Sequence, residues 1–122
     1  MSWSKQDIEA IAVSDDLHIA PFRADGETTG TPTWIWSVVV DGQLYVRAYN
    51  GLNSRWYKSA MAQRAGQINA AGNTHDVAFA PVEGALNDRI DDAYRAKYAA
   101  SQYLAPMIGD RARAATVRIS PR

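Results

Sequence analysis

The dipeptide Asp41-Gly42 constrains the fold of this chain more than any other feature, because it separates two runs of alternating apolar and polar residues. Asp-Gly favours the tight two-residue turn that joins antiparallel strands. With the turn placed there, Val40 lies opposite Gln43, and every further pair follows in the same register. The sequence therefore predicts a long β-hairpin that begins near Thr33 and ends at Asn50-Gly51.

The predicted register divides the side chains of the hairpin between two apolar faces. On the aromatic face, the expected pairs beyond the turn are Val38 with Tyr45, Trp36 with Arg47 and Trp34 with Tyr49. We expect Trp36 and Arg47 to form a cation–π pair. The opposite face carries Ile35, Val39, Leu44, Val46 and Ala48, with Thr33 and Ser37 as its polar members. Both faces need cover, so the aromatic face packs either inside the monomer or against a ligand or a second subunit.

Periodicity predicts that the rest of the chain alternates between helices and strands. Helices are expected over residues 5–13, from Asn53 or Ser54 to Gly66 or Gly72, and from Asn87 or Asp88 to Pro106 and Gly109. Strands are expected over residues 17–23, 74–82 and 114–120, and a loop is expected over residues 24–32. On the last helix, Asp91 and Arg95 have the spacing of an ion pair. This order predicts one α+β domain over residues 1–122 with a mostly antiparallel sheet.

Composition excludes several classes of function. The 13 basic and 13 acidic residues give no net charge, which argues against broad electrostatic attraction to nucleic acid or anionic lipid. The absence of cysteine excludes disulfides and thiol catalysis. The first residues lack the apolar core of a secretory signal, and no apolar run is long enough for a transmembrane helix. We therefore expect a cytoplasmic protein without a nucleic-acid or membrane partner.

The sequence contains no recognisable catalytic or metal-binding motif. His18 and His75 have no second ligand at the spacing that a metal site requires, so no metal is expected. The acidic pairs Asp15-Asp16 and Asp91-Asp92 point apart in a strand or helix, and we expect them to be solvated. The serines have no nucleophile-elbow context, so hydrolase chemistry is not supported.

The junction at residues 47–58, where the hairpin leads into a helix, is the strongest candidate for a binding site. A glycine permits the turn, the helix start presents unpaired N–H groups, and two cations follow, which together suit an anion such as phosphate. The predicted cofactor-binding residues are Trp34, Trp36, Arg47, Tyr49, Asn50, Gly51, Ser54, Arg55, Trp56 and Lys58. In the alternative interpretation, Asn53 or Ser54 only caps the helix, the two cations are solvated and the aromatic side chains fill the core.

The hairpin, the Tyr49-Asn50-Gly51 turn and the Trp56-Tyr57 helix start together resemble the small split β-barrel proteins that bind FMN or deazaflavin, especially the deazaflavin-dependent nitroreductase-like group. The local match covers about residues 28–61 and includes the loop Thr28-Thr29-Gly30. The whole chain also resembles a bacterial family of unknown function that is grouped with these barrels. The resemblance implies a mostly antiparallel split barrel with helices packed outside, and a homodimer that binds the cofactor at its subunit interface.

The resemblance also implies roles for individual residues. Thr28-Thr29-Gly30 would lie near the cofactor, the turn at residues 49–51 beside its phosphate, and Trp56-Tyr57 against the ring. This chain departs from the deazaflavin enzymes after Gly30, because Thr31-Pro32 stands where those enzymes carry Arg and Lys. Either cofactor binding has been lost, or phosphate is held differently, by Arg47, Arg55 and Lys58.

Two functions are consistent with these observations. In the first, a homodimer binds a flavin or deazaflavin ring on the aromatic face and transfers hydride or electrons to a small molecule. No catalytic residue is assigned, and Tyr49 is the first candidate for a proton donor. In the second, the chain is a non-enzymatic dimeric ligand-binding module that has lost cofactor binding.

Overall fold

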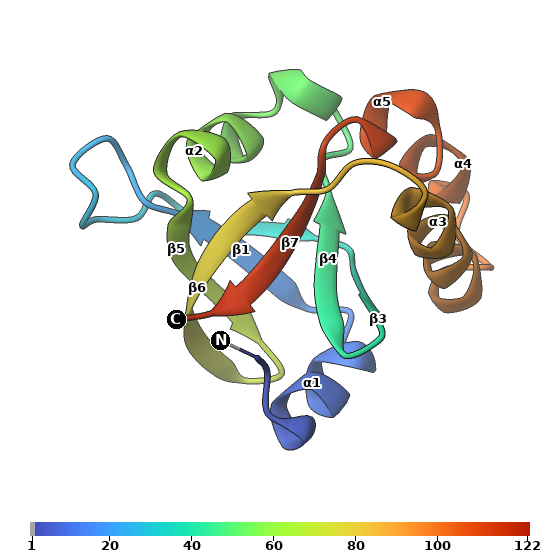
Figure 1. Cartoon of the computed structure of the whole chain (residues 1–122), viewed down its shortest axis with the longest axis horizontal. Helices are drawn as coiled ribbons and strands as arrows, with labels where there is room; N and C mark the ends of the chain where they lie inside the picture. Colours follow the sequence, from blue (N-terminus) through green and yellow to red (C-terminus); the bar gives the residue numbers. More distant parts are fainter. Residues whose placement is uncertain (1) are drawn as a thin grey trace.

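The computed structural model describes residues 2–122 and shows an α+β split barrel, the fold class that the sequence predicts. The helices are α1 (Lys5–Ala12), η1 (Gly51–Asn53, a 3-10 helix), α2 (Arg55–Gln63), α3 (Leu86–Lys97), α4 (Leu104–Met107) and α5 (Asp110–Arg113). The strands are β1 (Leu17–Pro21), β2 (Thr33–Ile35), β3 (Ser37–Val40), β4 (Gln43–Arg47), β5 (Ala65–Ala70), β6 (Asn73–Pro81) and β7 (Thr116–Pro121). Figure 1 shows the curled sheet at the centre, with α3, α4 and α5 together on one side.

The split in the barrel lies at Trp36. The strands form one 7-stranded sheet in the order β2-β1-β5-β6-β7-β4-β3, so the edge strands β2 and β3 are consecutive in the chain. Only Trp36 separates them. β2 pairs with β1, whereas β3 pairs with β4, and both pairings are antiparallel. One predicted hairpin strand is therefore divided between the two edges of the sheet.

The hairpin has the predicted turn and register, but it is shorter than predicted. Asp41-Gly42 forms the turn with positive φ at both positions, and the pairing extends to Ser37 opposite Val46. On the N-terminal side of Ser37, the strand segment pairs with β1 and not with β4, and there Trp34 pairs with His18. A strand cannot pair with β1 and β4 through the same backbone edge, so the two outermost predicted pairs are wrong: Trp36 with Arg47 and Trp34 with Tyr49.

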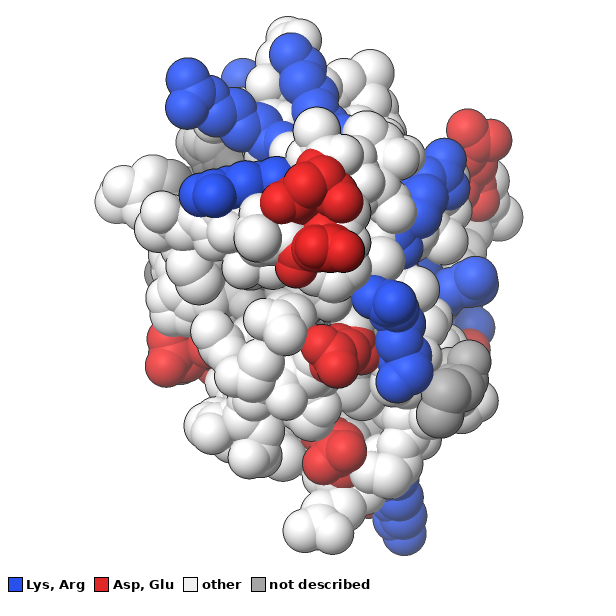
Figure 2. Space-filling view, turned by 90° about the vertical axis from the view of Figure 1, so that its left-hand side faces the viewer, with Lys and Arg blue, Asp and Glu red and all other residues white. Residues whose placement is uncertain are grey.

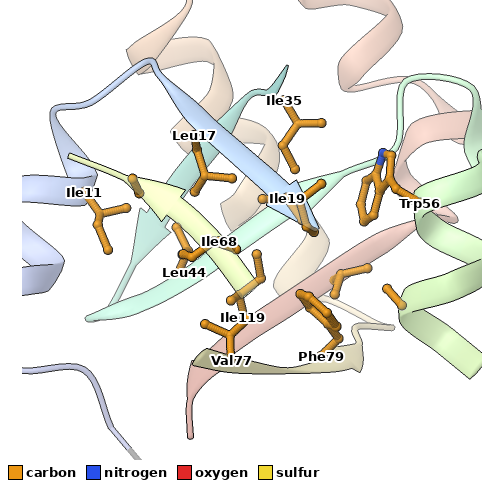
Figure 3. Close-up of a cluster of buried hydrophobic side chains, with 14 of the residues drawn as sticks. Ile11, Leu17, Ile19, Ile35, Leu44, Trp56, Ile68, Val77, Phe79 and Ile119 are labelled. Carbon is orange, nitrogen blue, oxygen red and sulfur yellow. The ribbon is translucent and has the colours of Figure 1, made fainter. Parts of the chain in front are cut away.

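The barrel interior contains the main apolar core. Figure 3 shows side chains of β1, β4, β5, β6 and β7 pointing toward one another, and the buried members include Leu17, Ile19, Leu44, Ile68, Val77, Phe79 and Ile119. The aliphatic face of the hairpin points into this core as predicted, through Ile35, Leu44, Val46, Ala48 and the partly buried Val39. Ile8 and Ile11 of α1 and Trp56 of α2 also belong to it. The core therefore ties both N-terminal helices to the sheet.

Helices of the C-terminal half cover the other face of the hairpin. A second apolar cluster joins Val38, Val40 and Tyr45 to side chains of α3, α4 and α5: Ile90, Tyr94, Met107 and Ala112. The part of the aromatic face that lies on β3 and β4 is thus covered within the monomer. The aromatic side chains beyond Ser37 have a different environment, which is described below.

The sequence analysis does not predict β5, and it places the end of α2 too far along the chain. α2 ends at Gln63, and Arg64 follows in the left-handed conformation with φ 60°. Gly66, which was expected to end the helix, lies inside β5, and Gly72 lies in the β5–β6 turn together with Ala71. Short runs such as Ala65–Ala70 have weak periodicity, and pairing with strands on both sides decides their conformation.

The last predicted helix divides into two, α3 and α4, and α5 follows it as a separate short helix. α3 ends at Lys97, and α4 packs back against it, so the chain reverses between them. The helical preference of Ala99-Ala100 is too weak to oppose this tertiary contact. The predicted strands over residues 74–82 and 114–120 are present as β6 and β7, and Ser4 caps α1 by accepting a hydrogen bond from the Asp7 N–H.

Gly66 is required where β5 pairs with the end of β1. A Cβ atom at this position would lie 2.6 Å from the Ala20 carbonyl oxygen and 2.6 Å from the Pro21 Cα. Both atoms belong to backbone that cannot move without disturbing the sheet. We expect Gly66→Ala to lower the free energy of unfolding by about 1–3 kcal/mol in urea denaturation.

The control for that substitution is Gly109→Ala. A Cβ at Gly109 meets only carbonyl oxygens at 3.5 Å, which is ordinary contact, and its φ of −83° suits alanine. An equal loss of stability in both variants would contradict the proposed backbone clash.

The surface that Figure 2 shows carries basic and acidic side chains interspersed among neutral ones. Among residues 2–122, no helix has the length and apolar character needed to cross a membrane.

Candidate functional site

A cavity of about 680 Å³ lies at the split in the barrel. It is beside Trp36, where the pairing of β2 with β1 gives way to the pairing of β3 with β4. Small-molecule sites typically have volumes of about 300–1,000 Å³. Most of the predicted cofactor-binding residues line this cavity: Trp34, Trp36, Arg47, Tyr49, Asn50, Ser54 and Trp56. The division of the hairpin strand thus creates the site, because it separates side chains that continuous pairing would have pressed together. We call it the aromatic cavity.

Two pairs of aromatic rings in contact form part of its wall. Trp36 lies parallel to Tyr98, with ring centroids 4.0 Å apart and planes within 3° of each other. Tyr49 meets Tyr103 edge to face at 6.5 Å. In each pair, one ring comes from the hairpin region and the other from the segment between α3 and α4. The C-terminal half of the chain therefore completes a site that the hairpin begins.

The two other tryptophans of the wall differ in burial. Trp34 is 53% exposed, and its indole N–H donates a 2.8 Å hydrogen bond to the Asp15 carbonyl oxygen, which fixes the direction of the ring. Trp56 is only 9% exposed and is also part of the core. Figure 3 shows it beside Ile19, at the edge of the core cluster. Trp34 therefore lies at the mouth of the cavity, and Trp56 at its boundary with the core.

Arg47 is occupied inside the monomer. Its side chain is fully buried and donates to Thr116 Oγ1 through Nε, to Asp91 and the Met107 carbonyl through Nη1, and to the carbonyl and side-chain oxygens of Asn87 through Nη2. These bonds use every N–H of a guanidinium group. Its cation–π partner is Tyr94, with 5.4 Å between Cζ and the ring centroid, and not Trp36 as predicted. Arg47 has no donor left for phosphate.

The environment of Asp91 also differs from the prediction. Asp91 was expected to be solvated and paired with Arg95, but it is 4% exposed and pairs with Arg47 and Arg113. Arg95 pairs with Asp92 instead. The reason is long-range, since β4 places the buried guanidinium of Arg47 against this face of α3. The cluster is a structural link among β4, β7, α3 and α4.

The predicted anion-binding residues at the junction are not all at one place. Gly51 is buried, with φ 69°, and a Cβ there would lie 2.6 Å from Arg111 Cγ, so it serves chain packing. Ser54 precedes α2 without a side-chain capping bond, so the predicted cap does not form through this hydroxyl. Lys58 is exposed and lines neither cavity described here. Arg55 lines a different cavity.

That second cavity has a volume of about 420 Å³ and lies between the end of β1 and the start of α2. Arg55 and Arg23 both line it, together with Gly30 and Thr31 of the loop that the resemblance places near the cofactor. Thr28 and Thr29 of that loop do not line it. We call it the arginine cavity.

Sequence reasoning missed several residues of the two cavities. The aromatic cavity also contains Asp15, Thr33, Ile35, Tyr98, Ser101, Tyr103 and Met107, and the arginine cavity contains Arg23. Tyr98 falls within the last predicted helix, and nothing local marks it as a partner of the hairpin. Arg23 ends a predicted strand directly before the loop, and this position was the one available signal for its role.

Two polar side chains beside the aromatic cavity, those of Tyr98 and Lys97, are hydrogen-bonded within the protein. The Tyr98 hydroxyl is hydrogen-bonded to the Ser37 backbone, and burial raises its pKa. Lys97 donates to the carbonyls of Ser14 and Ser37, and burial lowers its pKa. Such groups shape a cavity but are not free to accept or donate protons. The arrangement suits a ligand that brings its own reactivity.

A comparison with known protein families gives one match. Residues 7–119 match the family described as an uncharacterized protein conserved in bacteria, DUF2255. No curated protein matches the chain. The matched region extends from α1 into β7 and includes both cavities. The chain therefore belongs to this bacterial family of unknown function.

Proposed function

We propose that the aromatic cavity binds a flavin or deazaflavin ring and that the protein is an oxidoreductase acting on a small molecule. The observation that carries the proposal is the wall of aromatic side chains around a cavity of suitable volume: Trp34, Trp36, Tyr49, Trp56, Tyr98 and Tyr103. Planar rings gain both apolar burial and stacking energy in such a site. When bound, a flavin-type ring supplies hydride or electron transfer itself.

The residues of this chain would bind and orient the ring and exclude water. Trp36 is held in place by Tyr98, and Trp34 by its bond to the Asp15 carbonyl. Both indole rings are therefore fixed in position before a ligand binds. Tyr49 is 41% exposed, and Arg111 lies over its ring with 5.3 Å between Cζ and the centroid. Tyr49 is the first residue to test as a proton donor, because it lines the aromatic cavity and remains partly open to solvent.

We also propose that a second copy of the chain covers the mouth of the cavity. Large apolar side chains are exposed around it: Trp34, Tyr49, Leu52 and Tyr103. Exposed patches of this kind commonly mark interfaces. Sedimentation should show a dimer at micromolar concentration, and Leu52→Asp should shift it to monomer. A monomeric native protein would contradict this part of the proposal.

Titration with FMN and with a deazaflavin tests ring binding. Tryptophan fluorescence should fall to a plateau, because Trp34, Trp36 and Trp56 would contact the ring. Trp34→Ala should weaken binding by roughly 2- to 12-fold, since one aromatic contact contributes about 0.5–1.5 kcal/mol. Val13→Ala, at a position that is 86% exposed and outside the cavity, should leave affinity unchanged.

Flat titrations with both cofactors would overturn the enzyme proposal. They would leave the second candidate, a non-enzymatic dimeric module whose cavity takes another planar or apolar ligand. The wall of aromatic side chains supports that candidate equally well. If the ring binds, the reduced complex should be reoxidised by a small acceptor faster than the free reduced ring.

A further inference from the structure

The aromatic cavity and the arginine cavity are adjacent. Thr33 and Trp56 line both of them, so one indole and one threonine form the shared wall. Because the cavities share these two residues, a single ligand is a candidate to occupy both.

The two cavities differ in charge. The only guanidinium in the aromatic cavity is Arg47, whose donors are all used within the monomer. The arginine cavity contains Arg23 and Arg55 and no acidic side chain in its wall. Within residues 2–122, neither arginine forms an ion pair within 4.0 Å. Positive charge without a partner is thus concentrated beside the ring site.

The acid nearest in sequence to Arg23, Asp25, forms no ion pair with it within 4.0 Å. Asp25 accepts hydrogen bonds from the backbone N–H groups of Glu27 and Thr28 and from the Thr28 hydroxyl. These bonds, with a smaller contribution from Arg23, lower the pKa of Asp25 to about 2. The carboxylate is therefore committed to the turn of its own loop, and it lies outside the wall of the arginine cavity.

The other groups of the arginine cavity complete an anion site. Thr31 and Ser59 contribute hydroxyl groups to the wall. The loop backbone at Gly30 lies near Arg23, since a Cβ there would make an ordinary contact with the Arg23 Nε at 3.9 Å. Guanidinium groups bind phosphate and carboxylate through paired N–H donors, and hydroxyls add further hydrogen bonds.

We propose that the arginine cavity binds an anionic group, a phosphate or a carboxylate, carried by the same ligand whose ring occupies the aromatic cavity. The inference rests on the proposed function, and it specifies the ligand class as a planar ring with an acidic tail. The basic residues that the deazaflavin enzymes carry after the position of Gly30 are absent here. In their place, Arg23, which follows β1, and Arg55, which begins α2, would supply the positive charge.

Three probes with one ring test the inference: riboflavin, FMN and an N10-carboxyalkyl flavin. The native protein should bind FMN at least about tenfold more tightly than riboflavin, because charge-assisted hydrogen bonds form only with the charged tail. The carboxylate probe distinguishes the two anions. Equal gains in affinity over riboflavin indicate a site that accepts either anion, and a gain with FMN alone indicates a phosphate site. The affinity for FMN should fall with added salt, and that for riboflavin should not.

The double variant Arg23→Gln/Arg55→Gln should bind FMN no better than riboflavin and should bind riboflavin as the native protein does. Arg118→Gln, at an exposed arginine outside both cavities, should change neither affinity. Equal affinities of the native protein for all three probes would overturn the inference and leave ring binding intact. Failure of all three probes to bind would overturn both the inference and the proposed function.

Discussion

Replacing Arg47 with methionine is expected to lower the free energy of unfolding by about 3–5 kcal/mol. The side chain is fully buried, and its removal takes a donor from acceptors on three other elements: Asn87, Asp91, Met107 and Thr116. The Asn87 side-chain oxygen keeps a second donor, the Thr116 hydroxyl. Arg113 still pairs with Asp91, but through the other carboxylate oxygen. A buried acceptor that loses its donor cannot regain a bond with water, so the penalty persists.

Urea denaturation of Arg47→Met and Arg118→Met measures this effect, and the exposed control should change stability by less than about 0.5 kcal/mol. Arg47→Lys should also be destabilising, because a lysine cannot reach the same set of acceptors. The double variant Arg47→Met/Asp91→Leu should recover part of the loss, since it removes the buried charge as well. A loss below about 1 kcal/mol in Arg47→Met would show that the cluster does not hold the helices to the barrel.

Trp56→Ala is the second substitution with a large expected effect, a loss of about 3–5 kcal/mol. Trp56 belongs to the main core and forms the shared wall of the two cavities. Its removal costs apolar burial and joins both cavities to the core. Ring binding should be lost as well, because Trp56 forms part of the aromatic wall that would hold the ring.

Trp34→Ala is the matched control, since it removes the same side chain from the exposed mouth of the aromatic cavity. It loses one hydrogen bond to the Asp15 carbonyl and little burial, so we expect a cost of about 1 kcal/mol. The thermal unfolding midpoint of Trp56→Ala should lie clearly below that of Trp34→Ala. Equal midpoints would mean that Trp56 contributes no more to packing than an exposed tryptophan.

Local signals in the sequence predicted the hairpin and many of the residues that line the aromatic cavity. Asp41-Gly42 set the register, and the alternation around it separated the core face from the aromatic face correctly. Trp34, Trp36 and Tyr49 were assigned to a binding surface because so many large rings on one face need cover. The cavity they line supports that argument, although the pairs expected between them do not form.

The remaining parts depend on contacts that are distant in the sequence. Arg47 was expected to bind phosphate, because no local pattern shows that β4 places it against Asn87 and Asp91 of α3. Tyr98 reaches the cavity only because the chain reverses after α3. β5 forms because β1 and β6 offer edges on both sides, which the short run itself does not reveal.

The sheet order has a consequence for biosynthesis. β7 lies between β6 and β4, so the strand made after all the others occupies an interior position. Until it leaves the ribosome, β4 and β6 each expose an unpaired edge, and Arg47 lacks its Thr116 partner. The barrel therefore cannot close until β7 has emerged, and a product truncated before residue 116 would present two unpaired strand edges to other chains.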